Sequence, residues 1–261
     1  LLPSHLDIEL TERCNNACMH CYINRPADDV EAGGRELTTG EWAGILKQAA
    51  NLGALTVRFT GGEPLLRPDL AELYLTARRL GLGVVLFTNA RLMTPELADL
   101  FMRVPPRNAI EVSVYGMEPA SYDAVACSPG AWAEFRRGVQ LLVERRIPLA
   151  IKSVLLPPNR HEMEELESWV ASLPGIVQTP TYAVHLDLRA RRDSPSRNQL
   201  IRSLRLSPQE SVAISAREGA AYRRGMAEFA PRFMGPQGDR LFTCGAGEAA
   251  CVDAYGVLQM C

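Results

Sequence analysis

Long hydrophobic runs are missing from this sequence of 261 residues. No segment approaches the roughly 18 uninterrupted apolar residues of a membrane-spanning helix, and the first residues lack the basic and then apolar layout of a signal peptide. A basic surplus is also missing, because 28 Lys and Arg face 30 Asp and Glu. The net charge of -2 gives no support for binding nucleic acid or an anionic membrane. We therefore expect a cytoplasmic protein without nucleic-acid or membrane partners.

Low-complexity and coiled-coil segments are absent as well, since Pro and Gly are spread along the whole chain. Hydrophobic residues at 47% and charged residues at 22% are typical of a soluble globular protein. The length fits either one large α/β domain or a domain with a smaller appendage.

Seven cysteines are present, in two groups and one isolated position. The first group is Cys14, Cys18 and Cys21, the second is Cys244, Cys251 and Cys261, and Cys127 stands alone. A reducing compartment disfavours disulfides, so we expect metal-binding or catalytic thiols. The grouping indicates two separate thiolate centres.

Between the two groups, short strand-like runs alternate with amphipathic helical stretches. Strands are expected at residues 5–11, 54–60, 83–88, 109–115, 148–155 and 181–188. Helices are expected at residues 39–52, 69–80, 95–102, 131–145 and 160–172. This alternation implies parallel strands joined by right-handed crossovers. We predict an α/β fold, a partial (β/α)6 TIM-like barrel over residues 1–193.

The rest of the chain is expected to differ from this barrel. Residues 194–239 are predicted to be a connector and helical segment, in which the polar stretch 194–205 is a loop and 207–230 is helical. Residues 240–261 are rich in Gly and Cys and are predicted to begin a separate cysteine-rich extension that is incomplete at Cys261.

The strongest chemical signal is Cys14-Asn-Asn-Ala-Cys18-Met-His-Cys21, directly after the first predicted strand. Three thiolates this close together can hold one iron–sulfur cubane and leave one iron without a protein ligand. A structural zinc site that includes His20 is an alternative, although zinc usually draws its ligands from two separated pairs. The spacing therefore favours a cluster over a single ion.

This loop resembles the C-x3-C-x2-C signature of radical S-adenosylmethionine (SAM) enzymes, in which an aromatic residue, here Tyr22, follows the third cysteine. The resemblance implies a [4Fe-4S] cluster on Cys14, Cys18 and Cys21 whose open iron binds SAM. It also implies reductive cleavage of SAM to a 5'-deoxyadenosyl radical that abstracts hydrogen from a substrate. The protein then positions the cofactor and excludes water.

A second motif, Gly61-Gly62-Glu63-Pro64, follows the second predicted strand, at the mouth where barrel enzymes build their sites. Glycines allow the backbone to approach a ligand closely, and a carboxylate accepts hydrogen bonds from an ammonium group. By itself this segment could be a turn. One strand–helix unit after the cysteine loop, it resembles the GGEP motif that binds the amino group of SAM.

Polar residues end three further predicted strands at equivalent positions. By the same resemblance, Ser113 and Lys152 or Ser153 lie near the ribose or carboxylate of SAM, and Asn89 near the reaction chamber. Each could instead cap a strand or face solvent. The expected cofactor-binding residues are Tyr22, Gly61, Gly62, Glu63, Pro64, Asn89, Ser113, Lys152 and Ser153.

The C-terminal cysteines resemble a different element of the same superfamily. Eleven residues separate Cys244 from Gly256, and four more precede Cys261. This spacing is similar to the opening of the SPASM or twitch extension, which implies Cys244 and Cys261 as ligands of an auxiliary [4Fe-4S] cluster. By analogy the substrate is a peptide or protein, and the reductant a flavodoxin or ferredoxin. A small-molecule substrate and a non-catalytic iron–sulfur electron carrier are the alternatives.

Two cysteines lie outside these motifs. Cys251 is expected to be a buried structural thiol, with an unusual cluster ligand as the alternative. Cys127 has an ordinary explanation as a small apolar loop residue, and its functional alternative is a catalytic thiol that donates a hydrogen atom or a proton.

Overall fold

The structure is a computed structural model that describes residues 4–23, 25–183, 186, 194–217, 219–233 and 249–259. Its centre is a sheet of six parallel strands that follow one another in chain order. They are β1 (His5–Thr11), β4 (Thr56–Gly61), β5 (Gly83–Thr88), β6 (Ile110–Val114), β7 (Leu149–Val154) and β8 (Thr181–Ala183). The chain is thus an α/β fold with a mostly parallel sheet, consistent with the expected partial barrel.

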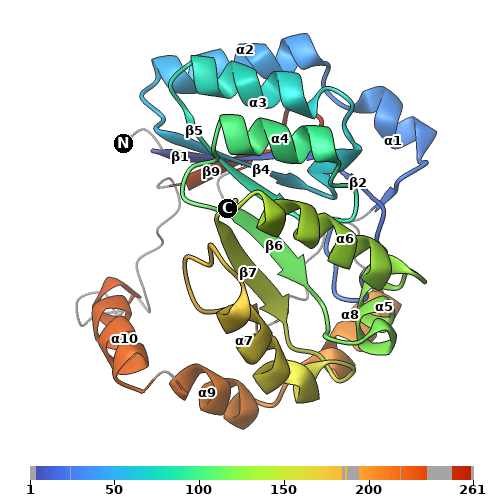
Figure 1. Cartoon of the computed structure of the whole chain (residues 1–261), viewed down its shortest axis with the longest axis vertical. Coiled ribbons are helices and arrows are strands. Elements are labelled where there is room, and N and C mark those ends of the chain that lie inside the picture. Colours follow the sequence, from blue (N-terminus) through green and yellow to red (C-terminus); the bar gives the residue numbers. More distant parts are fainter. Residues whose placement is uncertain are drawn as a thin grey trace.

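Helices connect these strands and follow one another along the sheet, from α2 and α3 near the top of Figure 1 to α7 near the bottom. They are α1 (Val30–Arg35), α2 (Thr39–Asn51), α3 (Leu70–Arg79), α4 (Pro95–Arg103), α5 (Pro119–Ala126), α6 (Ala131–Glu144) and α7 (Met163–Ser172). Short 3-10 turns, η1 (Pro64–Leu66) and η2 (Arg160–Glu162), precede α3 and α7. A capping box of Thr38 and Glu41 begins α2.

The two faces of the sheet differ in chemistry because alternate residues of a strand point to opposite sides. One face carries the buried apolar residues that pack in the main core with the helices, such as Phe59 and Ile151. The other face carries a row of ion pairs, in which Arg58 lies 3.2 Å from Asp7 and 3.3 Å from Glu111. The helix-covered face therefore stabilises the fold, and the polar face is available for chemistry.

The C-terminal strands extend the same sheet. β9 (Ala249–Val252) pairs in parallel with β1, and β10 (Leu258–Gln259) pairs antiparallel with β9. The turn between them is fastened by Tyr255, whose hydroxyl donates to Glu12 at 2.5 Å. In addition, the Leu37 N–H donates to the carbonyl of Ala254 at 2.9 Å. Residues 249–259 thus lie against β1 rather than apart from it, while the domain boundaries remain a prediction.

The segment after the barrel is more helical than expected. The predicted loop at residues 194–205 is wrong, because Ser194 caps helix α8 (Pro195–Leu204) by accepting from the Arg197 N–H. The stretch predicted as one helix is divided into α9 (Pro208–Ala216) and α10 (Ala220–Phe233). Across the described residues, no helix is both long enough and apolar enough to cross a membrane.

Candidate active site

The cysteine loop has little regular structure and is anchored by its backbone. It begins in the short strand β2 (Arg13–Cys14), which pairs with β3 (Arg25–Pro26). Its middle lies against the last turn of α5, where the Ala17 N–H donates to the Ala126 carbonyl at 2.9 Å. The Met19 N–H donates to the Val125 carbonyl at 3.2 Å. The end of α5 therefore supports the part of the loop that surrounds Cys18.

The three loop cysteines are half-buried, and the five cysteines in the described part of the chain form no disulfide. Burial raises the pKa of the Cys14 thiol far above its ordinary value and that of Cys18 to about 12. The Asn16 N–H donates to the Cys14 sulfur at 3.4 Å. Protonated thiols are thus favoured until a metal replaces the proton.

The glycine motif lies directly against the start of the cysteine loop. The Gly62 N–H donates to the Thr11 carbonyl at 2.8 Å, and the Glu63 N–H donates to the Arg13 carbonyl at 2.8 Å. A Cβ on Gly61 would meet the Thr11 oxygen at 2.2 Å, and one on Gly62 would meet the Arg13 oxygen at 2.1 Å. The glycines were expected to allow close approach of a ligand. In the structure, they allow close approach of the cysteine-bearing backbone.

Glu63 is buried at the beginning of η1, where Pro64 is the first residue. One carboxylate oxygen accepts from the Thr88 hydroxyl at 2.6 Å and the Leu65 N–H at 3.0 Å, and the other accepts from the Asn89 N–H at 2.8 Å. Burial raises the pKa of Glu63 to about 7, against the lowering effect of these hydrogen bonds. A nearby cation would favour its charged form.

A cavity of about 340 Å³ joins the cysteine loop to the carboxyl ends of the strands. It brings together all of the sequence-predicted residues of the barrel mouth apart from Pro64, which is buried at the start of η1. The shared lining includes Cys14, Cys18, Cys21, Tyr22, Gly61, Gly62, Glu63, Asn89, Ser113, Lys152 and Ser153. Tyr22 lies at the rim with 58% of its surface exposed. The sequence motifs thus meet at one end of the sheet.

The polar residues on β6 and β7 are held in different ways. Ser113 and Lys152 are partners in register, so they share the polar face. The Lys152 ammonium lies 3.5 Å from Glu111, whereas the Ser153 hydroxyl donates to the Val114 carbonyl at 2.7 Å. Lys152 is therefore better placed than Ser153 to contact an anionic group in the cavity.

A second cavity of about 510 Å³ lies on the other side of the cysteine loop. The same three cysteines line it together with Cys127 and Arg197. Cys127 is exposed and ends α5 in the left-handed conformation, with φ 47°, which is uncommon for residues other than glycine. Cys127 lines this second, outer cavity but does not line the first, inner cavity of about 340 Å³. Its catalytic role therefore stays a prediction.

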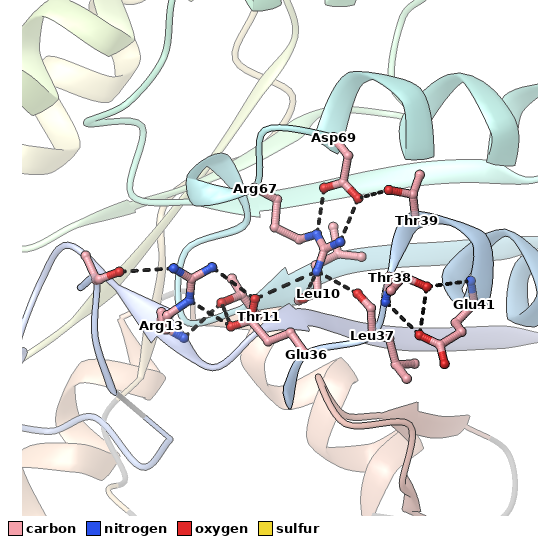
Figure 2. A network of polar contacts seen from close by, with 11 residues as sticks. Leu10, Thr11, Arg13, Glu36, Leu37, Thr38, Thr39, Glu41, Arg67 and Asp69 are labelled. Carbon is pink, nitrogen blue, oxygen red and sulfur yellow. Dashed lines mark hydrogen bonds and ion pairs between the residues drawn. The ribbon is translucent and has the colours of Figure 1, made fainter. Parts of the chain in front are cut away.

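A largely buried network of charged side chains links the cysteine motif to the glycine motif (Figure 2). Glu36 accepts from Arg13 at 2.9 and 3.0 Å and from the Thr11 hydroxyl at 2.5 Å, and it lies 3.8 Å from Arg67. Arg67 in turn donates to Asp69 at 2.8 and 2.6 Å. Because Arg13 precedes Cys14 and Arg67 ends η1, this network fixes the spacing of the two motifs.

Cys244 and Cys261 lie outside the described residues. Cys251 lies in β9, half-buried, in register with Asp7 on β1. The expected auxiliary cluster ligands therefore remain predictions.

The chain belongs to the radical SAM superfamily, whose family model matches residues 8–170. Members of this superfamily are enzymes that use a [4Fe-4S] cluster and SAM. The chain is similar to the PqqA peptide cyclase of Xanthomonas axonopodis pv. citri, with 32% identity over 209 residues, 77% of this chain and 54% of that protein. The PqqA peptide cyclase of Xanthomonas campestris pv. campestris is 31% identical over 265 residues, which are 94% of this chain and 68% of that protein. The chain thus spans about half the length of the first of these relatives.

The fold also has a solved counterpart. Streptococcus suis SuiB bound to S-adenosylmethionine superposes with a TM-score of 0.66 over 100% of this chain and 58% of that chain. The sequence identity is 16%, so this likeness supports the fold alone.

The residues of the site fit the two groups that this superfamily uses. Three thiols on one loop, around a shared cavity, are the donor set of a cluster that keeps one iron for another ligand. Among the described residues, no group of three or more His, Cys, Asp or Glu side chains is arranged to hold a single metal ion. The same cavity is lined by Glu63 and Lys152, which offer one acidic and one basic group for the charged ends of an amino acid.

Sequence reasoning missed several residues that shape this site. Tyr115 is half-buried and lines the inner cavity, and its hydroxyl interacts with Cys18 and Ser113. Tyr115 is two residues after Ser113 in a predicted strand, so both side chains are expected on the same face. This spacing could have identified Tyr115 as a site residue. Glu36 carried no local signal, because Thr11 and Arg13 lie 25 and 23 residues away from it. Arg67 has a partner nearby in the sequence, Asp69, but its contacts with the Leu10 and Leu37 carbonyls span 57 and 30 residues.

Proposed function

We propose that this chain is the catalytic core of a peptide-modifying radical SAM enzyme, a post-translational maturase. The observation that carries the proposal is the similarity, at 31–32% identity, to proteins named PqqA peptide cyclase. The cavity that joins the cysteine loop to the strand ends supplies a place for the chemistry. A cytoplasmic location and a flavodoxin or ferredoxin as reductant belong to the same proposal.

Cys14, Cys18 and Cys21 hold the [4Fe-4S] cluster in this proposal. When bound, the reduced cluster supplies the electron that cleaves SAM to a 5'-deoxyadenosyl radical, which abstracts hydrogen from the substrate. Asn16 and Asn89 donate toward the Cys14 sulfur at 3.4 and 3.9 Å. Hydrogen bonds to a ligating sulfur stabilise its negative charge and tune the cluster.

The cavity walls bind and orient SAM. Glu63 accepts from the cosubstrate's ammonium group, while Lys152 pairs with its carboxylate. Lys152 is the one Lys or Arg among the described residues that line the inner cavity, which suits it to this task. Gly61, Gly62 and Asn89 line the same cavity.

Apolar side chains complete the cavity. Phe87, Tyr115 and Leu186 line it on the strand side and keep water away from the carbon where hydrogen is abstracted. A peptide side chain that enters from the strand ends then meets the reactive carbon in a dry environment.

The experiment has two stages and uses protein reconstituted with iron and sulfide without oxygen. Dithionite and SAM are expected to release 5'-deoxyadenosine from the parent, and Cys18→Ala is expected to release none. Each short peptide encoded beside the gene is then incubated with the parent and its mass measured. A mass change that requires SAM supports a maturase.

Two outcomes contradict the proposal. Absence of 5'-deoxyadenosine from a protein with an intact reduced cluster would indicate an electron carrier. If a small metabolite, but no encoded peptide, stimulated the release of 5'-deoxyadenosine, the substrate would be a small molecule.

A further inference from the structure

A buried arginine lies behind the cysteine loop and is not one of the expected site residues. Arg91 follows Ala90, which has a left-handed backbone with φ 61°, and its N–H donates to the Asn89 side chain at 3.0 Å. This turn at the end of β5 directs the side chain toward the loop. Only 7% of the Arg91 side chain is exposed.

The guanidinium group contacts the loop between its first two cysteines. One terminal nitrogen donates to the Asn15 carbonyl at 2.6 Å and to the side-chain oxygen of Asn16. The same nitrogen reaches the Ser128 hydroxyl at 3.0 Å, beyond the end of α5. Arg91 therefore joins the cysteine loop to the segment that supports it, at the place where the loop has no regular secondary structure.

The charge of Arg91 is buried, whereas the carboxylate that pairs with it is partly exposed. Its other nitrogens pair with Glu134 of α6 at 2.8 and 2.6 Å. That carboxylate is 41% exposed, so water and salt screen it more than they screen the buried guanidinium. Burial raises the pKa of Glu63, and the charge of Arg91 is one of the effects that lower it, after the hydrogen bonds that Glu63 accepts.

We propose that Arg91 is a positioning residue of the cysteine loop and that its charge, balanced by Glu134, sets the reduction potential of the cluster held there. The first half concerns the chain alone, whereas the second rests on the proposed cluster site. A fixed positive charge stabilises the more negative, reduced cluster and raises its reduction potential.

The first test uses the protein before iron is added. Amide hydrogen exchange is measured for the loop in the parent, in Arg91→Lys and in Arg91→Gln. The amides of Ala17 and Met19 are expected to exchange faster in both variants, because lysine cannot make the forked contacts. Unchanged protection in Arg91→Gln would overturn the positioning role, whatever the protein catalyses.

The second test measures the midpoint potential of the reconstituted cluster. Arg91→Gln is expected to shift it to more negative values. Glu134→Gln is expected to shift it to more positive values, because the guanidinium loses its counter-charge. Glu134 does not contact the loop, so this variant keeps the test decisive if Arg91→Gln fails to bind iron.

A matched control is available at the end of α6, the helix that carries Glu134. Arg145 ends α6 and pairs with Asp99 of α4 at 2.5 Å, with side-chain exposures of 19% and 44%. Arg145→Gln is expected to leave the potential unchanged. Equal shifts in Arg91→Gln and Arg145→Gln, or shifts of the same sign in the Arg91 and Glu134 variants, would overturn the proposal.

Discussion

Replacement of Gly62 by alanine tests whether the glycine motif holds the cysteine loop. The added Cβ would lie 2.1 Å from the Arg13 oxygen, 2.5 Å from its carbonyl carbon and 2.8 Å from the Glu12 oxygen. All three atoms belong to backbone, so no side chain can rotate away. The two segments must separate by roughly 1 Å to restore ordinary contact.

The magnitude follows from this separation. Overpacking of a well-packed site costs about 1–3 kcal/mol. The two 2.8 Å hydrogen bonds, from the Gly62 and Glu63 N–H groups, stretch beyond useful length, and each is worth about 1 kcal/mol. We expect Gly62→Ala to lower the free energy of unfolding by about 3–5 kcal/mol and to weaken SAM binding.

Urea denaturation of the iron-free protein measures the first effect, and SAM titration of the reconstituted protein measures the second. Gly44→Ala is the control, because Gly44 lies inside α2 with nothing within 4 Å of an added Cβ. That variant is expected to stabilise the protein by about 0.5–1 kcal/mol. If Gly62→Ala were as stable as Gly44→Ala and bound SAM like the parent, the close backbone contact would have no role.

Three further predictions address other parts of the chain. Glu36→Ala leaves the Arg13 guanidinium without its buried carboxylate and is expected to cost about 2–4 kcal/mol in urea denaturation; Glu36→Gln keeps an acceptor and costs less, and equal losses would contradict the charge argument. Burial opposes ionisation of Asp7, but hydrogen bonds from its neighbours hold its pKa below the usual value. The stability it contributes is therefore present above about pH 4 and lost as pH falls below that, so Asp7→Asn is expected to flatten the acid limb of a stability–pH curve, and an unchanged slope would refute this. Cys244→Ala is expected to spare SAM cleavage but impair product formation, and an iron content equal to the parent's would argue against an auxiliary cluster.

The cysteine and glycine motifs could be placed together from the sequence because each follows a predicted strand. The carboxyl ends of neighbouring parallel strands meet at one edge, so the order of β1 and β4 already implied that Cys14 and Glu63 are neighbours. The reason for the two glycines was different from the one expected. Only the structure shows that the Arg13 backbone occupies the space in front of Gly62.

Long-range pairing could not be predicted in the same way. β9 joins β1 more than 240 residues earlier in the chain, and parallel pairing leaves no local mark in either segment. Arg91 likewise contacts Asn16 at a separation of 75 residues. Both features depend on the finished fold.

The error in the 194–205 segment has a local cause. Its many polar and basic residues suggested a loop, yet Ser194 followed by Pro195 is a common way to begin a helix. Ile201 and Leu204, three residues apart, are buried and supply a narrow apolar face. The Ser194-Pro195 helix start is therefore a better guide to this segment than its polar composition.

The central claim is that one loop holds a cluster with an iron open to SAM beside Glu63. Electron paramagnetic resonance of the reduced, anaerobically reconstituted protein, recorded with and without SAM, tests it most directly. We expect a [4Fe-4S] signal that changes when SAM is added and that is lost in Cys14→Ala. A cluster signal indifferent to SAM, or a centre without iron, would contradict the account.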